Sequence, residues 1–227
     1  MCIEIKHLAI EVTRRCNIKC SHCLRGDSQN KDIPLEYIDI LLDQVISIGH
    51  FCPTGGEPTL NIKAIRHFLD GCKKRNISIT SFFIATNGIY INEDFIDICN
   101  ELNEFCENKS YNSVQVSNDH YHIKQNMYND TLLKKLKFYT KRNRDDEDFE
   151  NGKKLHREGR ALENHKNAEL ISYAKPIFTV DSFDSNPIYL NVNGNIINGC
   201  DWSYDNQNLH FLCEVDYLEK YKNKLIK

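Results

Sequence analysis

Apolar and polar residues follow two different periods along this chain, and the two periods alternate. Residues 7–13 mix apolar and polar side chains and end in the alternating run Ile10-Glu11-Val12-Thr13, which is typical of a β-strand. From Pro34 to Val45, apolar residues recur three or four positions apart, which is the spacing of one face of an α-helix. The nearly continuous apolar run 77–85 indicates a strand buried on both faces, as in parallel sheets. The pattern therefore predicts strands and helices in alternation.

The same two periods predict the remaining elements. Residues 141–154 mix both charges without a core-forming period, so we expect a solvated loop there. Asn193-Gly194, between two short apolar runs, predicts a hairpin with a type I′ turn. The expected strands are 7–13, 48–52, 77–85, 114–116, 154–158, 177–180 and the hairpin arms 188–192 and 195–197, and the expected helices are 34–49, 61–72, 92–106, 132–139, 160–172 and 215–226.

This order of elements predicts an α/β fold. Strands separated by helix-length segments pair in parallel through right-handed crossovers. Five or six such units form a partial (β/α)5-6 TIM-like barrel and fall short of a complete eightfold barrel. We assign residues 1–180 to this barrel and residues 181–227 to a short hairpin–helix extension packed on it. Ligands in such folds bind at the carboxyl ends of the strands, so the chemistry should follow the strands.

Composition narrows the class of protein. The 227 residues carry 29 Lys and Arg against 32 Asp and Glu, a net charge of -3 that gives no reason to expect nucleic acid or an anionic membrane as partner. The N-terminus lacks the basic region and apolar core of a secretion signal, and no apolar run is long enough to span a bilayer. We therefore expect a cytoplasmic protein whose 10 cysteines stay reduced.

Three of these cysteines form a motif directly after the first expected strand. Cys16, Cys20 and Cys23 have C-x-x-x-C-x-x-C spacing, which can hold three corners of a 4Fe-4S cluster and leave the fourth iron open. Cys20 and Cys23 could instead be half of a zinc site or a redox pair. A closed zinc site needs four ligands, and a second C-x-x-C or H-x-x-x-H is absent from the sequence. The motif therefore favours the cluster.

A second motif follows the second expected strand. Gly55, Gly56, Glu57 and Pro58 would by themselves be a glycine turn with a surface glutamate. Combined with the cysteine motif, they resemble the radical SAM superfamily, in which the open iron binds S-adenosylmethionine and this segment holds the amino group of its methionine moiety. The resemblance implies that the glycines let backbone approach the cofactor, that Glu57 accepts a bond from the ammonium and that Pro58 stiffens the turn.

Further strand ends resemble the superfamily less specifically. Thr86 and Asn87 match a Thr-Asn-Gly turn near the cofactor, although Asn-Gly is also an ordinary turn. Ser117 and Asp119 look like positions that contact the ribose and carboxylate of S-adenosylmethionine. Arg160, within Gly-Arg-Ala, could pair with the same carboxylate or face solvent. The histidines at positions 120 and 122 are interpreted as surface residues, with substrate contact as the alternative.

The C-terminal region resembles a truncated form of the SPASM/Twitch-like extensions that peptide-modifying members carry. Cys200 follows its hairpin, and Cys213 is the last cysteine of the chain, so an auxiliary cluster lacks ligands. Four further cysteines, Cys52, Cys72, Cys99 and Cys106, could fold nearby and add ligands, but they are predicted to be small core residues. Cys200 could be a catalytic residue that returns a hydrogen atom to a substrate radical.

The resemblance implies a radical enzyme with a 4Fe-4S cluster and S-adenosylmethionine as cofactors. It would generate a 5′-deoxyadenosyl radical, and modification of a peptide or protein side chain is the favoured reaction. A reaction on a small molecule or nucleotide, and activation of a glycyl-radical enzyme, remain alternatives. A non-catalytic metal-binding protein is a more remote one. The expected partners are the substrate and a one-electron reductant such as flavodoxin or ferredoxin.

Overall fold

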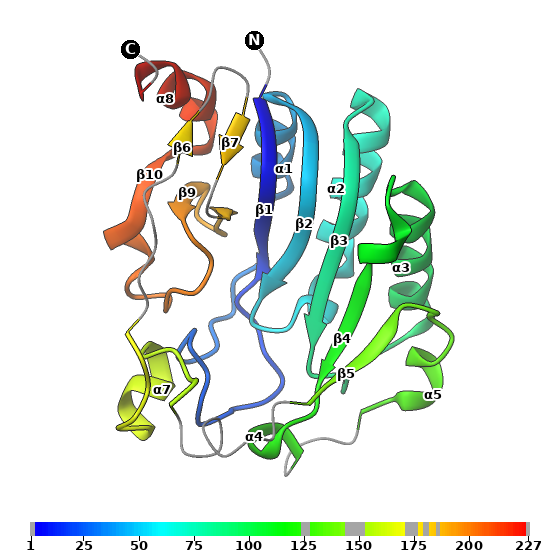
Figure 1. Ribbon diagram of the computed structural model, residues 1–227, viewed down its shortest axis with the longest axis vertical. Coiled ribbons are helices and arrows are strands. Elements are labelled where there is room, and N and C mark those ends of the chain that lie inside the picture. Colours follow the sequence, from blue (N-terminus) through cyan, green and yellow to red (C-terminus); the bar gives the residue numbers. More distant parts are fainter. Residues whose placement is uncertain are drawn as a thin grey trace.

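The computed structural model describes residues 3–123, 128–143, 153–170, 177–178, 182–184 and 187–225. Eight strands form one continuous path in the order β10-β9-β8-β1-β2-β3-β4-β5, with β7 beside β1 and β6 beside β7 (Figure 1). The strands are β1 (Ile3–Thr13), β2 (Val45–Gly55), β3 (Ser78–Thr86), β4 (Ser113–Ser117), β5 (Tyr139–Arg142), β6 (Ile177–Phe178), β7 (Ser182–Asp184), β8 (Ile188–Leu190), β9 (Asn195–Asn198) and β10 (Phe211–Glu214).

Short and long helices connect these strands. The α-helices are α1 (Leu35–Leu42), α2 (Ile62–Arg75), α3 (Glu93–Phe105), α4 (His120–Ile123), α5 (Asp130–Leu133), α7 (Gly159–Asn164) and α8 (Leu218–Leu225), and the 3-10 turns are η1 (Pro58–Asn61), η2 (Lys109–Tyr111), η3 (Gln207–His210) and η4 (Val215–Tyr217). Among these, no described helix combines the length and apolar character that crossing a bilayer requires.

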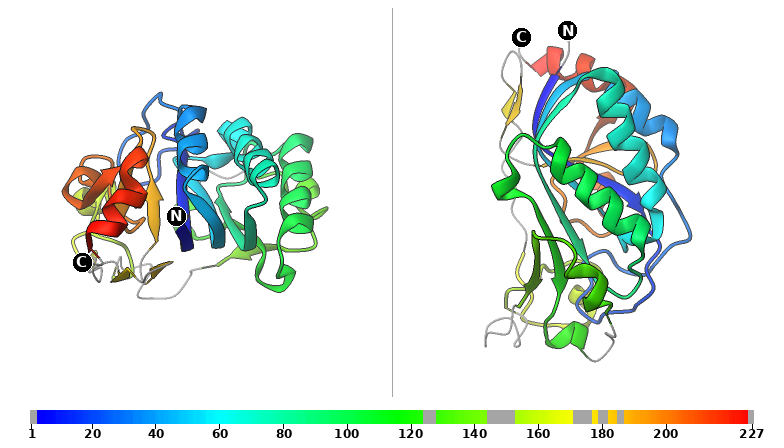
Figure 2. Two further views of the ribbon diagram at one scale, coloured as in Figure 1. Left: turned by 90° about the horizontal axis from the view of Figure 1, so that it is seen from above. Right: turned by 90° about the vertical axis from the view of Figure 1, so that its right-hand side faces the viewer.

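The central strands are parallel, as the alternating pattern predicted. β8 and β2 each pair in parallel with β1, and β3, β4 and β5 continue the parallel array on the side of β2. The sheet is curved, and α1, α2 and α3 cover one of its faces (Figure 2). This is the open partial barrel expected from the sequence. The parallel strands end at the same edge, so the loops after β1, β2, β3 and β4 lie together.

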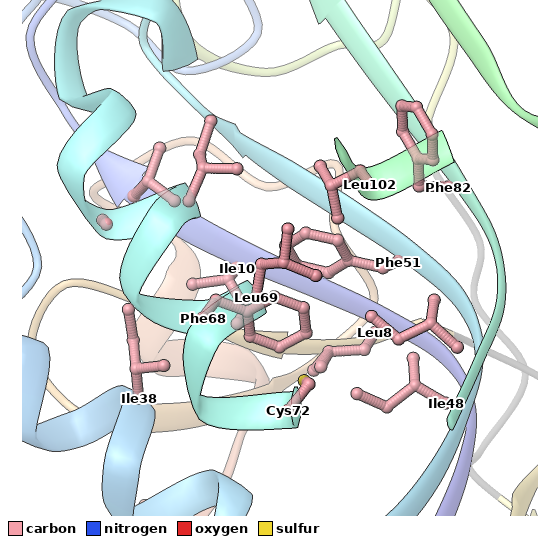
Figure 3. Close-up of a cluster of buried hydrophobic side chains, with 14 of the residues drawn as sticks. Leu8, Ile10, Ile38, Ile48, Phe51, Phe68, Leu69, Cys72, Phe82 and Leu102 are labelled. Carbon is pink, nitrogen blue, oxygen red and sulfur yellow. The ribbon is translucent and has the colours of Figure 1, made fainter. Parts of the chain in front are cut away.

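The main core fills the space between the sheet and the helices. Phe51 of β2 stacks on Phe68 of α2 with ring centroids 3.8 Å apart, and both side chains are buried (Figure 3). Cys72, Cys99 and Cys106 lie in this same core, which confirms their predicted role as small core residues. The opposite, concave face of the sheet is therefore left to form a cavity.

Several element boundaries differ from the prediction. Val45, expected on the first helix, begins β2, because α1 ends at Leu42. The predicted helix 132–139 is wrong. α5 is a single turn that ends at Leu133, and Tyr139 begins β5, where it pairs with Val114 of β4. The helix-like spacing of the leucines led to the wrong prediction. Leu133 and Leu136 lie in a turn region, and both are buried as they would be on one face of a helix.

The segment after residue 153 is also less regular than predicted. The expected strand 154–158 is reduced to one bridge between His156 and Glu169. The expected helix 160–172 becomes the shorter α7, which ends at Asn164, and its last two predicted residues lie outside the described part. Of the predicted strand 177–180, the first two residues form β6 and the rest are outside the described residues. Most of the predicted loop 141–154 is likewise outside, and its first two residues end β5.

The predicted C-terminal hairpin is present, but its turn is not of type I′. A type I′ turn needs positive φ at both central residues, and in the described hairpin Gly194, with φ 80°, has it while Asn193 does not. The Asn191 side chain explains the difference, because its Oδ1 accepts from the backbone N–H groups of Asn193 and Asn195 and stabilises a longer loop.

Buried polar contacts join this hairpin to the barrel. The Glu11 carboxylate on β1 is fully buried and accepts hydrogen bonds from Arg14 Nε (3.0 Å), Tyr189 OH (2.9 Å), Val192 N (3.0 Å) and Gln207 Nε2 (3.0 Å). A buried charge with this many donors is well compensated. The region after β7 thus adds strands to the barrel sheet and forms one wall of its concave side. The assignment of residues 181–227 as a separate extension stays a prediction.

Candidate active site

A cavity of about 450 Å³ opens at the carboxyl ends of the parallel strands. The loops after β1, β2, β3 and β4 contribute to its wall, together with α7 and the segment after β9. Of the residues predicted to bind a metal or cofactor or to act in catalysis, all except Asp119 line it: Cys16, Cys20, Cys23, Gly55, Gly56, Glu57, Pro58, Thr86, Asn87, Ser117, Arg160 and Cys200. The structure therefore brings the separate motifs to one place.

The three motif cysteines lie on the loop that follows β1. Cys20 is buried, and Cys16 and Cys23 are half-buried. Burial raises the pKa of the Cys20 thiol to about 12, and the neighbouring Cys23 and Cys16 add to the shift. Among the described residues, the one set of three or more ligand-type side chains with atoms within 4.8 Å of one another is His22, Asp119 and His122, and the motif cysteines form no such set.

Because Gly55 and Gly56 have no side chains, the backbone at the end of β2 packs directly against the backbone at the start of the cysteine loop. A Cβ on Gly55 would stand 2.0 Å from the carbonyl oxygen of Thr13, and one on Gly56 would stand 2.2 Å from that of Arg15. Backbone hydrogen bonds run across the contact, from Gly56 N to Thr13 O and from Glu57 N to Arg15 O, each 2.8 Å. The close approach is thus to the chain's own backbone, and it sets the position of the cysteine loop. An approach to the cofactor stays a prediction.

The buried Glu57 side chain connects η1 to the end of β3 through hydrogen bonds. Its Oε1 accepts from Thr59 N (3.2 Å), Thr59 Oγ1 (2.9 Å) and Thr86 Oγ1 (2.6 Å), and its Oε2 accepts from Asn87 N (2.8 Å). Burial raises the pKa of this carboxyl group, and the four hydrogen bonds counteract the rise. Oε2, which takes a single bond from these donors, retains capacity for a further donor in the cavity.

Asn87 connects the end of β3 to the cysteine loop. Its Nδ2 donates to Asn17 Oδ1 at 2.8 Å, and Asn17 follows Cys16 directly. Its Oδ1 accepts from Ile89 N at 3.0 Å, which fixes the side chain in the turn. Asn87 therefore links the Glu57 site to the cysteine site.

Arg160 holds the other side of the cysteine loop. Its Nε donates to Cys20 O (2.8 Å), its backbone N–H donates to Cys23 O (2.9 Å) and its Nη1 pairs with Asp27 (2.8 Å). Gly159 makes this contact possible, because its Cβ would lie 2.4 Å from the backbone nitrogen of Gly26. Arg160 also lines the cavity, and its predicted pairing with the carboxylate of S-adenosylmethionine stays a prediction.

Replacing Arg160 with alanine is expected to loosen the metal site without unfolding the protein. The variant loses a charge-assisted bond to the Cys20 carbonyl, a contribution of about 1.5–3 kcal/mol. After iron loading, a chelator should therefore remove iron at least about tenfold faster than from the wild type. The exposed Arg157 gives a matched control, and Arg157→Ala should release iron at the wild-type rate. Equal rates in both variants would contradict the role of Arg160.

The end of β4 forms a buried wall of histidine, aspartate and tyrosine. Ser117 lines the cavity, whereas Asp119 is fully buried behind it and bonds through Oδ1 to Nδ1 of His122 at 2.7 Å. The rings of His22 and His122 lie edge to face with centroids 4.6 Å apart. The interpretation of position 122 as a surface residue is wrong, because His122 is buried and lines the cavity. His120 is exposed, as predicted.

Sequence reasoning missed other residues of the wall. Arg25, Cys52, His50 and Tyr204 all line the cavity. Cys52 was predicted to be a core residue because buried cysteines usually lie in helical or apolar surroundings. The alternation of β2 instead turns it to the concave face, in register with Ala9 of β1. Alternate residues of a strand point to the same face, so Cys52 and His50 share the face of Thr54. This alternation, applied to the sequence, would have predicted both residues in the cavity wall.

A family model of the Radical SAM superfamily matches residues 10–161 of the chain. The chain belongs to this superfamily. An uncharacterized protein of Methanocaldococcus jannaschii is 33% identical over 103 residues, which cover 43% of this chain and 36% of that relative. The chain thus spans about a third of the length of the curated relative it matches.

Solved structures of radical SAM proteins have a similar fold. BtrN in complex with AdoMet and 2-DOIA gives a TM-score of 0.59 at 15% identity, over 98% of this chain and 82% of that chain. Hexahistidine-tagged anSMEcpe with bound AdoMet gives a TM-score of 0.58 at 15% identity, over 99% of this chain and 82% of that chain. At this level of identity the likeness concerns the fold alone.

The residues present fit the cofactors that the superfamily implies, a 4Fe-4S cluster and S-adenosylmethionine. Cys16, Cys20 and Cys23 supply three soft thiol ligands from one loop, enough for three corners of a cluster with the fourth iron open. Beside them the cavity offers a buried carboxylate with acceptor capacity, Glu57. The three cysteines would hold the cluster, and the loops after β2, β3 and β4 would surround the second cofactor.

Proposed function

We propose that this chain is a radical enzyme that modifies a peptide or protein side chain. The observation that carries the proposal is the convergence of the three cysteines and the Gly55–Pro58 segment on one cavity at the strand ends. Bound there, the cluster and S-adenosylmethionine would supply a 5′-deoxyadenosyl radical that removes a hydrogen atom from the substrate.

The residues of this chain have separate tasks in the proposal. Cys16, Cys20 and Cys23 would ligate the cluster, and Arg160 and the two glycines hold their loop in place. Oε2 of Glu57 would accept a bond from the ammonium group of the methionine moiety. Thr86 and Asn87 orient the Glu57 carboxylate. Ser117 would contact the ribose from the cavity wall, and Asp119 holds the His122 ring from behind it. The walls of the cavity keep water and other hydrogen donors away from the reacting carbon.

A peptide substrate has support from a structural neighbour. Native anSMEcpe was solved with bound AdoMet and the Kp18Cys peptide, and it gives a TM-score of 0.57 at 15% identity over 98% of this chain and 82% of that chain. BtrN, solved with AdoMet and 2-DOIA, supports a small-molecule substrate as the second candidate. In either case a one-electron reductant such as flavodoxin or ferredoxin would deliver the electron, and the reaction would proceed in the cytoplasm.

Fractionated extract of the source cells can separate the two substrate classes. Ultrafiltration divides the extract into a macromolecular fraction and a small-molecule filtrate, and each is added anaerobically to the iron-loaded enzyme with S-adenosylmethionine and dithionite. We expect the macromolecular fraction to raise 5′-deoxyadenosine formation several-fold, and protease treatment to abolish the increase. An increase caused by the filtrate alone would contradict the peptide proposal and favour the small-molecule candidate.

A further inference from the structure

We propose that Arg25 and Tyr204 form a receptor in the cavity wall for a carboxylate group of the substrate. This inference rests on the proposed radical function and deepens it, because it names the chemical class that the substrate must carry. A peptide could supply the carboxylate from an acidic side chain or from its C-terminus. In either case the receptor would fix the position of the peptide relative to the carbon that reacts.

Arg25 is a buried cation that uses little of its hydrogen-bonding capacity. The residue is 9% exposed and lines the cavity. Its Nη1 donates to the backbone oxygen of Trp202 at 2.7 Å, and its Cζ lies 5.0 Å from the centroid of the Tyr189 ring. Within the described part of the chain, no carboxylate forms an ion pair with this guanidinium group. The group stays charged at every pH of interest, so its remaining N–H donors call for an acceptor.

Arg14 shows how this fold compensates a buried guanidinium that has a structural role. Its nitrogens donate to the side-chain oxygens of Glu11 (3.0 Å), Gln29 (2.9 Å) and Gln207 (2.7 Å). Arg25 has no such set of partners among the described residues. Asp201 also lines the cavity, and its charge acts on Arg25 from a distance without an ion pair between the two. The N–H groups of Arg25 therefore remain available to a ligand.

The Tyr204 hydroxyl is a second donor beside Arg25. Tyr204 is 7% exposed and lines the cavity, and its buried hydroxyl makes no hydrogen bond within the described residues. Its backbone N–H donates to the Arg25 oxygen at 3.1 Å, so the two residues lie side by side. Burial raises the pKa of the hydroxyl, which therefore stays protonated and able to donate. A buried donor without an acceptor is costly, so a ligand that supplies the acceptor gains affinity.

One guanidinium and one hydroxyl group suit a carboxylate. The planar guanidinium can bond both carboxylate oxygens at once, and one of these oxygens can also accept from the hydroxyl. The two charges then cancel. A doubly charged phosphate would instead leave a negative charge in a cavity whose wall includes Leu8, Ala9 and Pro187. The receptor therefore favours a carboxylate over a phosphate.

This receptor lies apart from the expected position of S-adenosylmethionine. Arg25 contacts Tyr189 of β8, whereas Glu57 bonds to Thr86 at the end of β3. In the sheet, β1 and β2 lie between β8 and β3. The ammonium and carboxylate groups of S-adenosylmethionine share one carbon atom, so a cofactor held at Glu57 keeps its carboxylate on that side of the cavity. The carboxylate at Arg25 would therefore belong to the substrate.

Trp202 supplies the readout, because it is the only tryptophan of the chain and its backbone oxygen is the partner of Arg25. Its fluorescence is recorded while three peptides are titrated anaerobically into the iron-loaded enzyme with S-adenosylmethionine. Acetyl-Ala-Glu-Ala-amide has a side-chain carboxylate, acetyl-Ala-Gln-Ala has a C-terminal one and acetyl-Ala-Gln-Ala-amide has neither. We expect one of the first two to bind at least about tenfold more tightly than the third, and the tighter one identifies the source of the carboxylate.

Substitutions separate a receptor from a structural role. Arg25→Gln and Tyr204→Phe should each remove most of the preference for the carboxylate, and Arg25→Lys should retain part of it because the charge stays. Tyr204→Phe removes only a hydroxyl that makes no hydrogen bond in the described structure, so this variant should fold like the wild type and keeps the test valid if Arg25→Gln unfolds. Arg157→Gln and Tyr111→Phe, at exposed positions, are the matched controls and should keep the full preference.

The outcomes separate this inference from the proposed function. Equal binding of the three peptides, binding of none, or a preference that survives both Arg25→Gln and Tyr204→Phe would overturn the receptor, and 5′-deoxyadenosine formation would still support the radical function. A loss of affinity for S-adenosylmethionine in Arg25→Gln would also overturn it, because Arg25 would then hold the cofactor. If the wild type forms no 5′-deoxyadenosine, the proposed function itself fails, whichever peptide binds.

Discussion

Replacing Gly55 with alanine is expected to lower the free energy of unfolding by roughly 3 kcal/mol or more and to abolish iron binding. Gly55 has φ 135°, a conformation that other residues rarely adopt, and its Cβ would lie 2.0 Å from the Thr13 carbonyl oxygen. That oxygen accepts the hydrogen bond from Gly56 N, so the backbone cannot move aside without breaking the contact between β2 and the cysteine loop. Denaturant unfolding and iron analysis measure the two effects.

Gly71 supplies the control for this substitution. It lies in α2, where the atom nearest to an added Cβ is Leu42 Cδ1 at 2.6 Å, the end of a flexible side chain. Alanine also favours the helix by up to about 1 kcal/mol. Gly71→Ala should therefore stay within about 1 kcal/mol of the wild type and bind iron normally. Normal iron binding by Gly55→Ala would refute the proposed link between the glycine segment and the cysteine loop.

Replacing Glu57 with glutamine should reduce stability and cofactor cleavage together. The amide keeps one carbonyl oxygen, so in either orientation its NH2 group faces a present donor, Thr86 Oγ1 in one and Asn87 N in the other. Leaving such groups unsatisfied in a buried site costs about 2–4 kcal/mol in the free energy of unfolding. Loss of the charge that we propose holds the ammonium group should lower 5′-deoxyadenosine formation by about 10- to 100-fold. Denaturant unfolding and the cleavage rate at saturating S-adenosylmethionine check both numbers.

Glu107→Gln is the matched control for Glu57. Glu107 is exposed, and its carboxylate accepts from Thr80 at 3.4 Å, near the opposite end of β3. Its replacement should change neither quantity appreciably. If Glu57→Gln behaved like Glu107→Gln, the carboxylate would have no part in the site and the function of this segment would need another explanation.

The sequence allowed the parallel fold and the motif residues of the cavity wall to be predicted because both depend on local signals. Strand and helix periods identify β1, β2 and β3, and the motif residues follow them in sequence. Side-chain bonds between distant segments have no such signal. Asn87 donates to Asn17, and Arg160 donates to the Cys20 carbonyl. Both bonds form only where separate loops meet, so the spacing of residues along the chain does not predict them.

Two kinds of error had physical causes that recur in such predictions. Leu133 and Leu136 are buried by a turn, and their helix-like spacing concealed the start of β5. Cys52 was assigned to the core from the spacing of the cysteines, and it does pack against a hydrophobic cluster, but it also lines the cavity. The register between strands, which decides what lies beside a residue, depends on tertiary pairing that a single sequence does not contain.

The most direct test of the account is 5′-deoxyadenosine formation by the anaerobically reconstituted protein, measured with its iron content. We expect about four iron and four sulfide per chain. Reductive cleavage of S-adenosylmethionine should accompany them in the wild type, and both should be lost in Cys16→Ala, Cys20→Ala and Cys23→Ala. One zinc per chain, or a stable cluster that leaves S-adenosylmethionine intact, would contradict the account and identify the cysteine loop as a structural metal site.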